Sequence, residues 1–422
     1  MEWKEVRLGN VCEIYGRIGF RGYTTNDLVD TPKEGAISLS PKNIINGELN
    51  LEQCTYIKWD KYYESPEIMI NPNEIVITKT GSSVGRTTFV RRVVHPMTLN
   101  PQLVVLKNIS ENAEFLSYYI KSALFQSVLK SIVVGSAIPT LSQKNLANLM
   151  INVPKEFEDQ RRIASILSSL DRKIELNNKI NADLEEMAQA IFKNWFVDFE
   201  PFKNGKFVDS ELGMIPEGWK VSQIADIPHI LENGKRPKGG AVEKGIPSVG
   251  AEHVKGMCTY DYSKTKYINC EFAAKLKTGK INGYELMIYK DGGKPGYFIP
   301  NFSIFGEGYP FENCYLNEHV FKLDFDGNKE FNIFCYFFFK TEQIMSYFNA
   351  QGAKAAIPGI NKKDVENIYI FSPDNESVIK FGEFAYPLFK QMLKNAIENR
   401  TLSLLRDTLL PRLMSGELEV PQ

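Results

Sequence analysis

Cysteine is scarce in this sequence, and long apolar runs are missing from it. The six cysteines among 422 residues form no C-x-x-C pair and no Cys/His ligand spacing, which argues against a zinc site and against a disulfide framework. No apolar run approaches the roughly 18 residues that a membrane helix needs. The first residues, Met1 to Lys4, lack the apolar stretch of a signal peptide. We therefore expect a soluble protein in a reducing, cytoplasmic setting, without a bound metal.

Catalytic motifs are lacking as well. The four histidines lie in unrelated contexts, and neither G-x-S-x-G nor H-E-x-x-H occurs. Residues 81–87, GSSVGRT, superficially resemble a phosphate loop, but they have three residues between the glycines instead of four, and Arg in place of Lys. A glycine motif for a methyl donor and the Asn-Pro-Pro-aromatic signature of an amino-methyltransferase are also missing. The chain is therefore predicted to be non-catalytic, with no cofactor of its own.

A strong charge of one sign is the third thing missing, because the net charge is only −1. Residues 1–155 carry 17 Lys/Arg against 14 Asp/Glu, residues 216–373 carry 19 against 18, and the remaining parts carry 14 against 19. The usual electrostatic footprint of a nucleic-acid binder is therefore weak. The small positive excess nevertheless falls on two separate stretches of similar length.

These two stretches belong to an internal repeat with a period of about 217 residues. The matching segments occur in the same order in both copies: Trp3-Lys4 and Trp219-Lys220, EIVITKTG at 74–81 and ELMIYKDG at 285–292, Leu99-Asn100 and Leu316-Asn317, AIPTL at 137–141 and AIPGI at 356–360, Pro154 and Pro373. Each match is weak alone, but their common order indicates a duplicated unit. At roughly 150 residues per domain, the length also suggests two or three domains.

Each repeat begins with mixed strands and short helices. Short apolar runs at 74–78 and 103–106 predict strands, because Gly, Pro and Asn turns separate them. One helix is predicted near 114–129, with a counterpart near 332–348.

Each repeat ends in one long helix. From residue 157 to about 197 there is no Gly or Pro, and apolar residues recur at helical spacing. The pattern returns from 376 to 410, where Pro387 is expected to kink or restart the helix. Asn177 and Asn181 in the first helix match Asn395 and Asn399 in the second. Such pairs either fix the register of a coiled coil or lie solvated on an outer face, and the sequence leaves both open.

Two helices of this length, on the order of 55 Å, are expected to pack on each other as an antiparallel coiled-coil rod. We therefore predict an α+β protein with a pseudo-twofold internal repeat. Its two globular α/β domains would cover residues 1–155 and 216–373, and two helical spacers would cover 156–215 and 374–422.

Several loops of the globular parts carry basic and polar side chains that suit contacts with nucleic-acid phosphates and base edges. The interpretation as plain surface loops and hairpin turns stays open. In the first repeat the candidates are Arg17, Arg21, Lys42, Asn43, Lys79, Ser82, Ser83 and Arg86. In the second repeat they are Lys235, Arg236, Lys238, Glu252, His253, Lys290, Lys294 and Tyr297.

Three segments carry a family resemblance: LEEMAQAIFKNWF at 184–196, LGMIPEGW at 212–219 and TLSLLRDTLLPRLMSGEL at 401–418. They resemble the helical signatures, and the entry to the second recognition domain, of the specificity subunit of Type I restriction–modification systems. The resemblance covers the whole chain, although the recognition domains match only in framework.

This resemblance implies a DNA-binding subunit without catalytic activity. Two target-recognition domains would each read half of a split site in double-stranded DNA, while the helices set the gap and dock two modification (methyltransferase) subunits. S-adenosylmethionine would belong to those subunits, and ATP and magnesium to the restriction subunits of the full complex. The implied partner-binding residues are Leu184, Met187, Ile191, Phe192, Trp195, Leu402, Leu405, Arg406, Leu409 and Leu410.

Two alternatives differ from this hypothesis in class. One is a silent scaffold or decoy with the same fold that reads no DNA. The other is a methyltransferase fused to its own specificity part, against which the missing catalytic motifs argue. Because the two recognition domains differ in most loop residues, the two half-sites are expected to differ in sequence.

Overall fold

The computed structural model of the chain describes residues 1–45, 47–134, 139–292, 296–353 and 358–420. The chain folds as two compact units, which are considered separately. Unit 1 comprises Met1–Arg172 and Leu402–Gln422, and unit 2 comprises Lys173–Thr401. Each unit therefore contains one globular part and one end of each of two long helices.

Unit 1 contains two four-stranded sheets, with the orders β2-β11-β8-β9 and β10-β4-β7-β3, and the strand pairs β1-β12 and β5-β6. The strands are β1 (Trp3–Arg7), β2 (Glu13–Tyr15), β3 (Leu28–Val29), β4 (Gly35–Leu39), β5 (Ile44–Ile45), β6 (Glu48–Leu49), β7 (Tyr56–Lys58), β8 (Ile75–Thr78), β9 (Thr87–Phe89), β10 (Met97–Leu99), β11 (Leu103–Lys107) and β12 (Met150–Pro154). The pair β4-β10 is parallel, whereas β8 and β11 are antiparallel. The predicted strands at 74–78 and 103–106 are confirmed.

The central strands β8 and β11 of unit 1 are apolar at all positions but their last, because both of their faces are buried. In β8, Ile75 and Ile77 pack into one core, which the helices cover. Val76, which points the other way, packs into a second core that faces the other sheet. This explains why these strands read as continuous apolar runs and not as an alternating pattern.

The short helices of unit 1 are α1 (Leu8–Val11), α2 (Trp59–Tyr63), α3 (Ala113–Lys121), α4 (Ala123–Ser131) and α5 (Gln143–Ala147). The prediction of one helix near 114–129 was wrong, because the helix ends at Ser122 and a new one begins. Ser122 has an extended backbone, with ψ 148°, and its side chain accepts a hydrogen bond from the Phe125 amide. A serine in this position caps a new helix start.

Unit 2 repeats this architecture. Its sheets have the orders β16-β22-β19-β20 and β18-β17-β21, and β15 pairs with β23 as β1 pairs with β12. The strands are β13 (Phe207–Val208), β14 (Ile215–Pro216), β15 (Val221–Gln223), β16 (Ile230–Asn233), β17 (Ile246–Val249), β18 (Lys266–Ile268), β19 (Leu286–Tyr289), β20 (Phe302–Ile304), β21 (Tyr315–Leu316), β22 (Val320–Asp324) and β23 (Tyr369–Phe371).

The short helices of unit 2 are α7 (Cys270–Ala274), α8 (Lys329–Phe339), α9 (Glu342–Gly352) and α10 (Lys362–Glu366). The helix predicted near 332–348 is also two helices, which separate at Thr341, where ψ is 149°. The break thus recurs at the equivalent place in both units. Together with the repeated four-stranded main sheet and the repeated pairing of the first and last strands, it confirms the predicted duplication.

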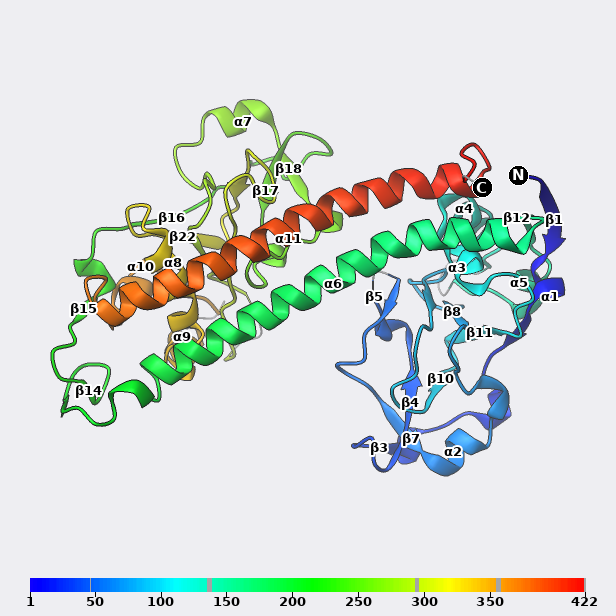
Figure 1. Cartoon of the computed structure of the whole chain (residues 1–422), viewed down its shortest axis with the longest axis horizontal. Helices are drawn as coiled ribbons and strands as arrows, with labels where there is room; N and C mark the ends of the chain where they lie inside the picture. The colour runs from blue at the N-terminus through cyan, green and yellow to red at the C-terminus, as the bar shows by residue number, and fades with distance from the viewer. Residues whose placement is uncertain (46, 135–138, 293–295, 354–357, 421–422) are drawn as a thin grey trace. The chain divides into compact units, whose positions relative to one another are not determined.

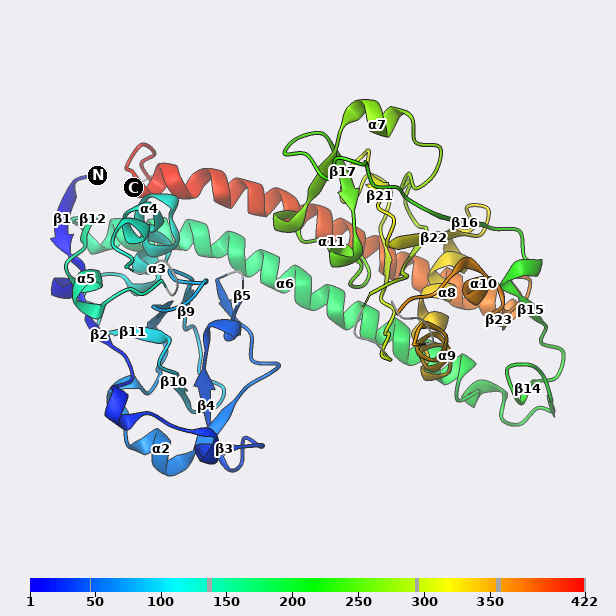
Figure 2. The same ribbon diagram turned by 180° about the vertical axis from the view of Figure 1, so that it is seen from behind.

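The two predicted long helices are confirmed as α6 (Phe157–Phe196) and α11 (Glu376–Met414). In each unit, one end of α6 lies beside one end of α11 (Figures 1 and 2). In unit 1, Ile163 and Leu167 of α6 share a core with Leu413 of α11. In unit 2, Phe192 of α6 meets the ring of Phe381 of α11 at 5.3 Å. An apolar stripe on each helix therefore reaches a different core at each end.

The second helix does not restart at Pro387, so that one of the two outcomes expected there, a restart, was wrong. Helix α11 runs through this position without a break in its assignment. Pro387 is exposed, whereas Phe381, Ala385 and Phe389 on the same helix are buried. The carbonyl that loses its hydrogen-bond donor therefore lies on the solvent side, where water can satisfy it, while the buried face holds the helix in place.

The asparagine pairs lie between the helices in unit 2 and hydrogen-bond across them. Asn177 is fully buried, and its Nδ2 donates to Asn399 Oδ1 at 2.9 Å. Asn395 Nδ2 donates to Asn181 Oδ1 at 2.8 Å. Of the two interpretations of these residues, register fixing is therefore the one that the structure supports, and the partners run antiparallel.

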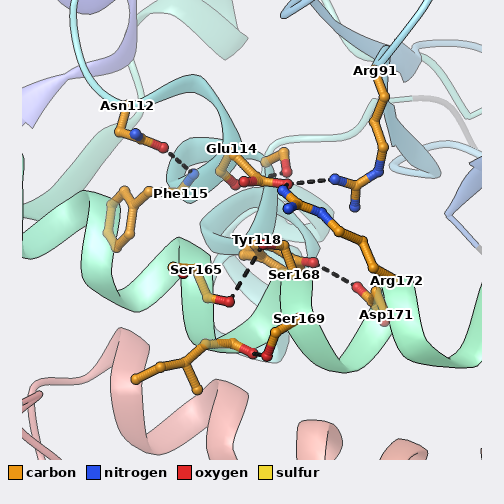
Figure 3. A network of polar contacts seen from close by, with 12 residues as sticks. Arg91, Asn112, Glu114, Phe115, Tyr118, Ser165, Ser168, Ser169, Asp171 and Arg172 are labelled. Carbon is orange, nitrogen blue, oxygen red and sulfur yellow. Dashed lines mark hydrogen bonds and ion pairs between the residues drawn. The ribbon is translucent and has the colours of Figure 1, made fainter.

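In unit 1 a polar network fastens α3 to α6 (Figure 3). Tyr118 of α3 donates its hydroxyl to Asp171 Oδ2 at 2.6 Å. Glu114 of the same helix pairs with Arg91 and lies 3.4 Å from Arg172 of α6. In unit 2, Tyr336 of α8 donates its hydroxyl to Glu185 of α6. The short helix is thus fixed to the long one in both units.

None of the helices that the structure describes combines the length and the apolarity that a bilayer crossing requires.

Candidate functional site

The loop between β8 and β9 carries four of the candidate residues of unit 1. It connects the two antiparallel strands over residues 79–86 and contains two left-handed glycines, Gly81 at φ 100° and Gly85 at φ 89°. The amides of Gly81, Val84, Gly85 and Arg86 all donate to main-chain carbonyls nearby. These four amides are therefore occupied by the fold of the loop itself. Ser82 and Arg86 are exposed, and Lys79 and Ser83 are half-buried.

Lys79 lies in a surface hollow of about 590 Å³, which we call the Lys79 hollow. Its lining residues come from three separate segments: Lys79, Thr80, Pro101, Gln102, Thr140, Leu141, Ser142 and Gln143. Burial lowers the pKa of Lys79. None of the lining residues is acidic, and among the described residues no carboxylate forms an ion pair with this ammonium. The hollow therefore presents one cation together with amide and hydroxyl groups.

Three main-chain hydrogen bonds hold this hollow together. The Lys79 amide donates to the Gln102 carbonyl at 2.8 Å, and the Leu141 amide donates to the Lys79 carbonyl at 2.8 Å. The Gly81 amide donates to the Pro139 carbonyl at 3.0 Å. Thr80 and Thr140 also form an antiparallel bridge. Residues in or beside three of the repeated segments, 79–81, 101–102 and 139–143, thus meet here.

We call these main-chain hydrogen bonds and the bridge the frame, and unit 2 contains the same frame. The Lys290 amide donates to the His319 carbonyl at 3.1 Å, and the Ile360 amide donates to the Lys290 carbonyl at 2.7 Å. The Gly292 amide donates to Pro358 at 2.9 Å, and Asp291 bridges Gly359 as Thr80 bridges Thr140.

The side chains on the two frames are different. Lys290 Nζ lies 2.9 Å from Asp291 Oδ2, and Asp291 Oδ1 lies 2.5 Å from His319 Nδ1. The Lys290 ammonium also lies 5.4 Å from the centroid of the Phe321 ring. Tyr297 is exposed, whereas Lys294 lies outside the described residues.

In the first glycine-rich loop of unit 1, Arg17 and Arg21 both contact groups of the same unit. Arg17 is 5% exposed, and its Nε donates to the Leu99 carbonyl at 2.8 Å. Arg21 lies 3.4 Å from Glu67, and Lys42 is exposed. Asn43 is buried and caps a 3-10 turn, where its Oδ1 accepts from the Ser40 amide at 3.0 Å. Arg17 and Asn43 therefore build the loop instead of facing solvent.

The equivalent loop of unit 2 is more accessible. Lys235, Arg236 and Lys238 are all exposed, and Arg236 lies 3.7 Å from Glu318. His253 occupies the place of Asn43, is 1% exposed and stacks on Tyr260 with ring centroids 4.2 Å apart. Burial lowers the pKa of His253, which favours the neutral imidazole.

The remaining candidate of this loop, Glu252, lies 3.0 Å from Lys266.

The ten candidate partner-binding residues of the long helices include both exposed and buried side chains. Met187 and Leu405 are 50% and 46% exposed, respectively. Phe192 is a core residue, and Leu184, Ile191 and Trp195 pack against the same core in unit 2. Leu409 and Leu410 pack against the helix-covered core of unit 1, and Leu402 is half-buried. Arg406 is bound within unit 1 to Asp171 at 2.7 Å.

Four side chains at the two frames were not identified from the sequence: Gln102 and Gln143 in unit 1, Asp291 and His319 in unit 2. They lie in or beside the repeated segments, so the alignment of the two copies was a usable signal. No local motif marks them, because each frame is assembled from segments that are distant in the chain.

The comparisons with known proteins agree on one family. The sequence profile of the Type I restriction modification DNA specificity domain matches residues 1–186. The whole chain is 28% identical to the specificity subunit of the Type I restriction enzyme MjaIX from Methanocaldococcus jannaschii, over 94% of that relative. It is 24% identical to the HindI specificity subunit from Haemophilus influenzae, over 99% of this chain and 100% of the relative.

A solved structure shares the fold. The crystal structure of the Type I restriction–modification S subunit from M. genitalium matches with a TM-score of 0.57 and 15% identity. The match covers 98% of this chain and 96% of that one.

Proposed function

We propose that this chain, which belongs to the family of Type I restriction–modification DNA specificity subunits, reads a bipartite DNA site with its two repeated globular parts. The observation that carries this proposal is the duplicated frame around Lys79 and Lys290. The main-chain bonds are the same in both copies, while the side chains on them differ. A shared scaffold with different polar side chains is what recognition of two unlike half-sites requires, since base edges are distinguished by their donor and acceptor patterns.

The target-recognition domains of this proposal are residues 1–155 and 216–373. Their base and phosphate contacts come from exposed or half-buried candidates, among them Lys42, Lys79, Ser82, Ser83, Arg86, Lys235, Arg236, Lys238 and Tyr297. Arg17, Asn43 and His253 act by shaping the loops, because their polar atoms are buried.

The helices of 156–215 and 374–422 set the gap between the half-sites in this proposal. The buried asparagine contacts support this role, because a shift of α6 along α11 would break them. Exposed apolar residues of the helices, including Leu176, Met187, Leu404 and Leu405, would dock two modification (methyltransferase) subunits. Those subunits would bind S-adenosylmethionine, and restriction subunits with ATP and magnesium would complete the nuclease.

The experiment is co-expression of the chain with the modification subunit of its system, followed by mapping of methylated adenines across the host DNA by single-molecule sequencing. We expect a split motif of two unlike halves with a fixed gap. Exchange of residues 1–155 for those of another member of the family should change one half only. A stable complex without new methylation would refute the proposal and favour the decoy alternative.

A further inference from the structure

The two frames differ in whether a carboxylate lies next to their central lysine, Lys79 or Lys290. In unit 1 the Lys79 hollow contains no carboxylate, and the half-buried ammonium has lost part of its hydration. In unit 2 the Asp291 carboxylate lies 2.9 Å from the Lys290 ammonium. The cation at the same main-chain position is therefore available to an external anion in one unit and neutralised in the other.

We propose that the Lys79 hollow is a site for one phosphate group of the DNA backbone, and that its counterpart at Lys290 is not. This inference rests on the proposed function, since it assigns a phosphate contact to one recognition domain only. Unit 1 would then bind its half-site with a lysine–phosphate contact that releases a counterion, and the frame of unit 2 would lack this contact.

The donor set of the hollow supports an anionic ligand. Gln102 Oε1 accepts a hydrogen bond from Asn100 Nδ2 at 3.2 Å, which leaves the Gln102 amide hydrogens to point elsewhere. Gln143 and Ser142 add an amide and a hydroxyl to the lining. An ammonium surrounded by neutral donors matches the oxygens of a phosphodiester, and a partly desolvated cation attracts an anion more strongly than a solvated one does.

The frame of unit 2 has different side chains at the positions equivalent to Thr80, Gln102 and Gln143. Asp291 replaces Thr80 and binds both Lys290 and His319. His319 replaces Gln102, and its Nε2 lies 3.3 Å from Glu318. Lys362 replaces Gln143, but its Nζ donates to the Leu231 carbonyl. A phosphate at this position would meet the Asp291 carboxylate, which repels it.

The test is the salt dependence of DNA binding by the full chain with its modification subunits, on a duplex that carries the methylated motif. Each phosphate contact contributes about 0.9 to the slope of log K against log salt. We expect Lys79→Gln to lower that slope by about 0.9, so that its affinity falls about 3.5-fold less than that of the wild type between 50 and 200 mM salt. Lys79→Arg should retain the wild-type slope.

Lys290→Gln is the matched control, because it removes a lysine from the same position of the other frame. We expect it to leave the slope unchanged, whereas Asp291→Asn should raise the slope by releasing Lys290. A wild-type slope in Lys79→Gln, in a complex that still binds the motif, would overturn the inference and leave the proposed function intact. Equal losses in Lys79→Gln and Lys290→Gln would overturn the asymmetry.

Inorganic phosphate distinguishes the two sources of the anion. If Lys79 binds free phosphate and not the DNA backbone, titration calorimetry with phosphate alone would show binding that Lys79→Gln abolishes, while the DNA salt slope would stay at the wild-type value. That combination would also overturn the inference. Failure of the wild-type complex to bind any DNA would instead refute the proposed function.

Discussion

Arg406 of α11 donates from Nη1 to Asp171 Oδ1 of α6 at 2.7 Å, while the other oxygen of the same carboxylate accepts a hydrogen bond from the hydroxyl of Tyr118 at 2.6 Å. One acidic side chain thus joins both long helices to the short helix α3 within unit 1. Arg406 was expected to bind a partner subunit, and the structure engages it within the chain. Burial raises the pKa of Tyr118, and so does the neighbouring Asp171 carboxylate, which keeps the phenol protonated as a donor.

Asp171→Ala should destabilise unit 1 by about 1.5–3 kcal/mol, because hydrogen bonds to a charged group are lost and the mostly buried Tyr118 hydroxyl is left without its acceptor. Hydrogen exchange of the amides in α3 and at the start of α6 measures this effect locally. Asp407→Ala is the matched control, since Asp407 pairs with the same Arg406 at 2.8 Å but its side chain is 63% exposed. Equal exchange in both variants would contradict a structural role for Asp171.

Asn177→Ala should lower the free energy of unfolding of the helix pair in unit 2 by about 1–3 kcal/mol. The buried side-chain amide of Asn177 donates to both Asn399 and Glu398, and both hydrogen bonds are lost. Asn178→Ala provides the comparison, because Asn178 also contacts Asn399 but is exposed.

Asn177→Leu tests the register of the two helices instead of their stability. We expect it to keep the helices folded while the methylated motifs acquire a second gap length, and a single unchanged gap would show that Asn177 does not set the register.

Leu405→Asp should abolish co-purification with the modification subunits, because Leu405 and its neighbour Leu404 are exposed apolar residues of α11. A charge at this exposed position should change the free energy of unfolding by only about 0.5 kcal/mol. Leu405→Met retains the apolar surface and should assemble normally. Co-purification of the Leu405→Asp chain at the wild-type ratio would move the docking surface elsewhere.

Lys235→Ala and Arg236→Ala should each weaken DNA binding, because both side chains are exposed on one loop of unit 2. Arg236 is the exposed partner of its 3.7 Å ion pair with Glu318, and Glu318 also lies 3.3 Å from His319, so that removing the arginine should cost little stability. Equal weakening on all sequences would mark a phosphate contact, and weakening on the cognate motif alone would mark a base contact. Lys206→Ala, outside this loop, serves as the control. Unchanged binding at low salt would exclude the loop from the interface.

The sequence by itself determined the duplication, the two long helices and the buried central strands. These features depend on local patterns: apolar residues at helical spacing from 157 to 197, and apolar runs such as 75–78 between turn residues. It also contained the family resemblance, which the comparisons confirm. The order of the matching segments was enough to show the repeat, although each match was weak.

The tertiary structure alone decided which polar residues face solvent. Arg17 and Lys79 look alike in the sequence, but Arg17 bonds to Leu99 and is buried, whereas Lys79 lines a hollow without an acidic neighbour. The Lys79 hollow exists because β8 pairs with β11 and the Thr80–Thr140 bridge brings a third segment alongside. Contacts between segments this far apart depend on how whole elements pack, and no local periodicity records them. The same holds for Pro387, where burial of the opposite face keeps a helix intact that local preference would end.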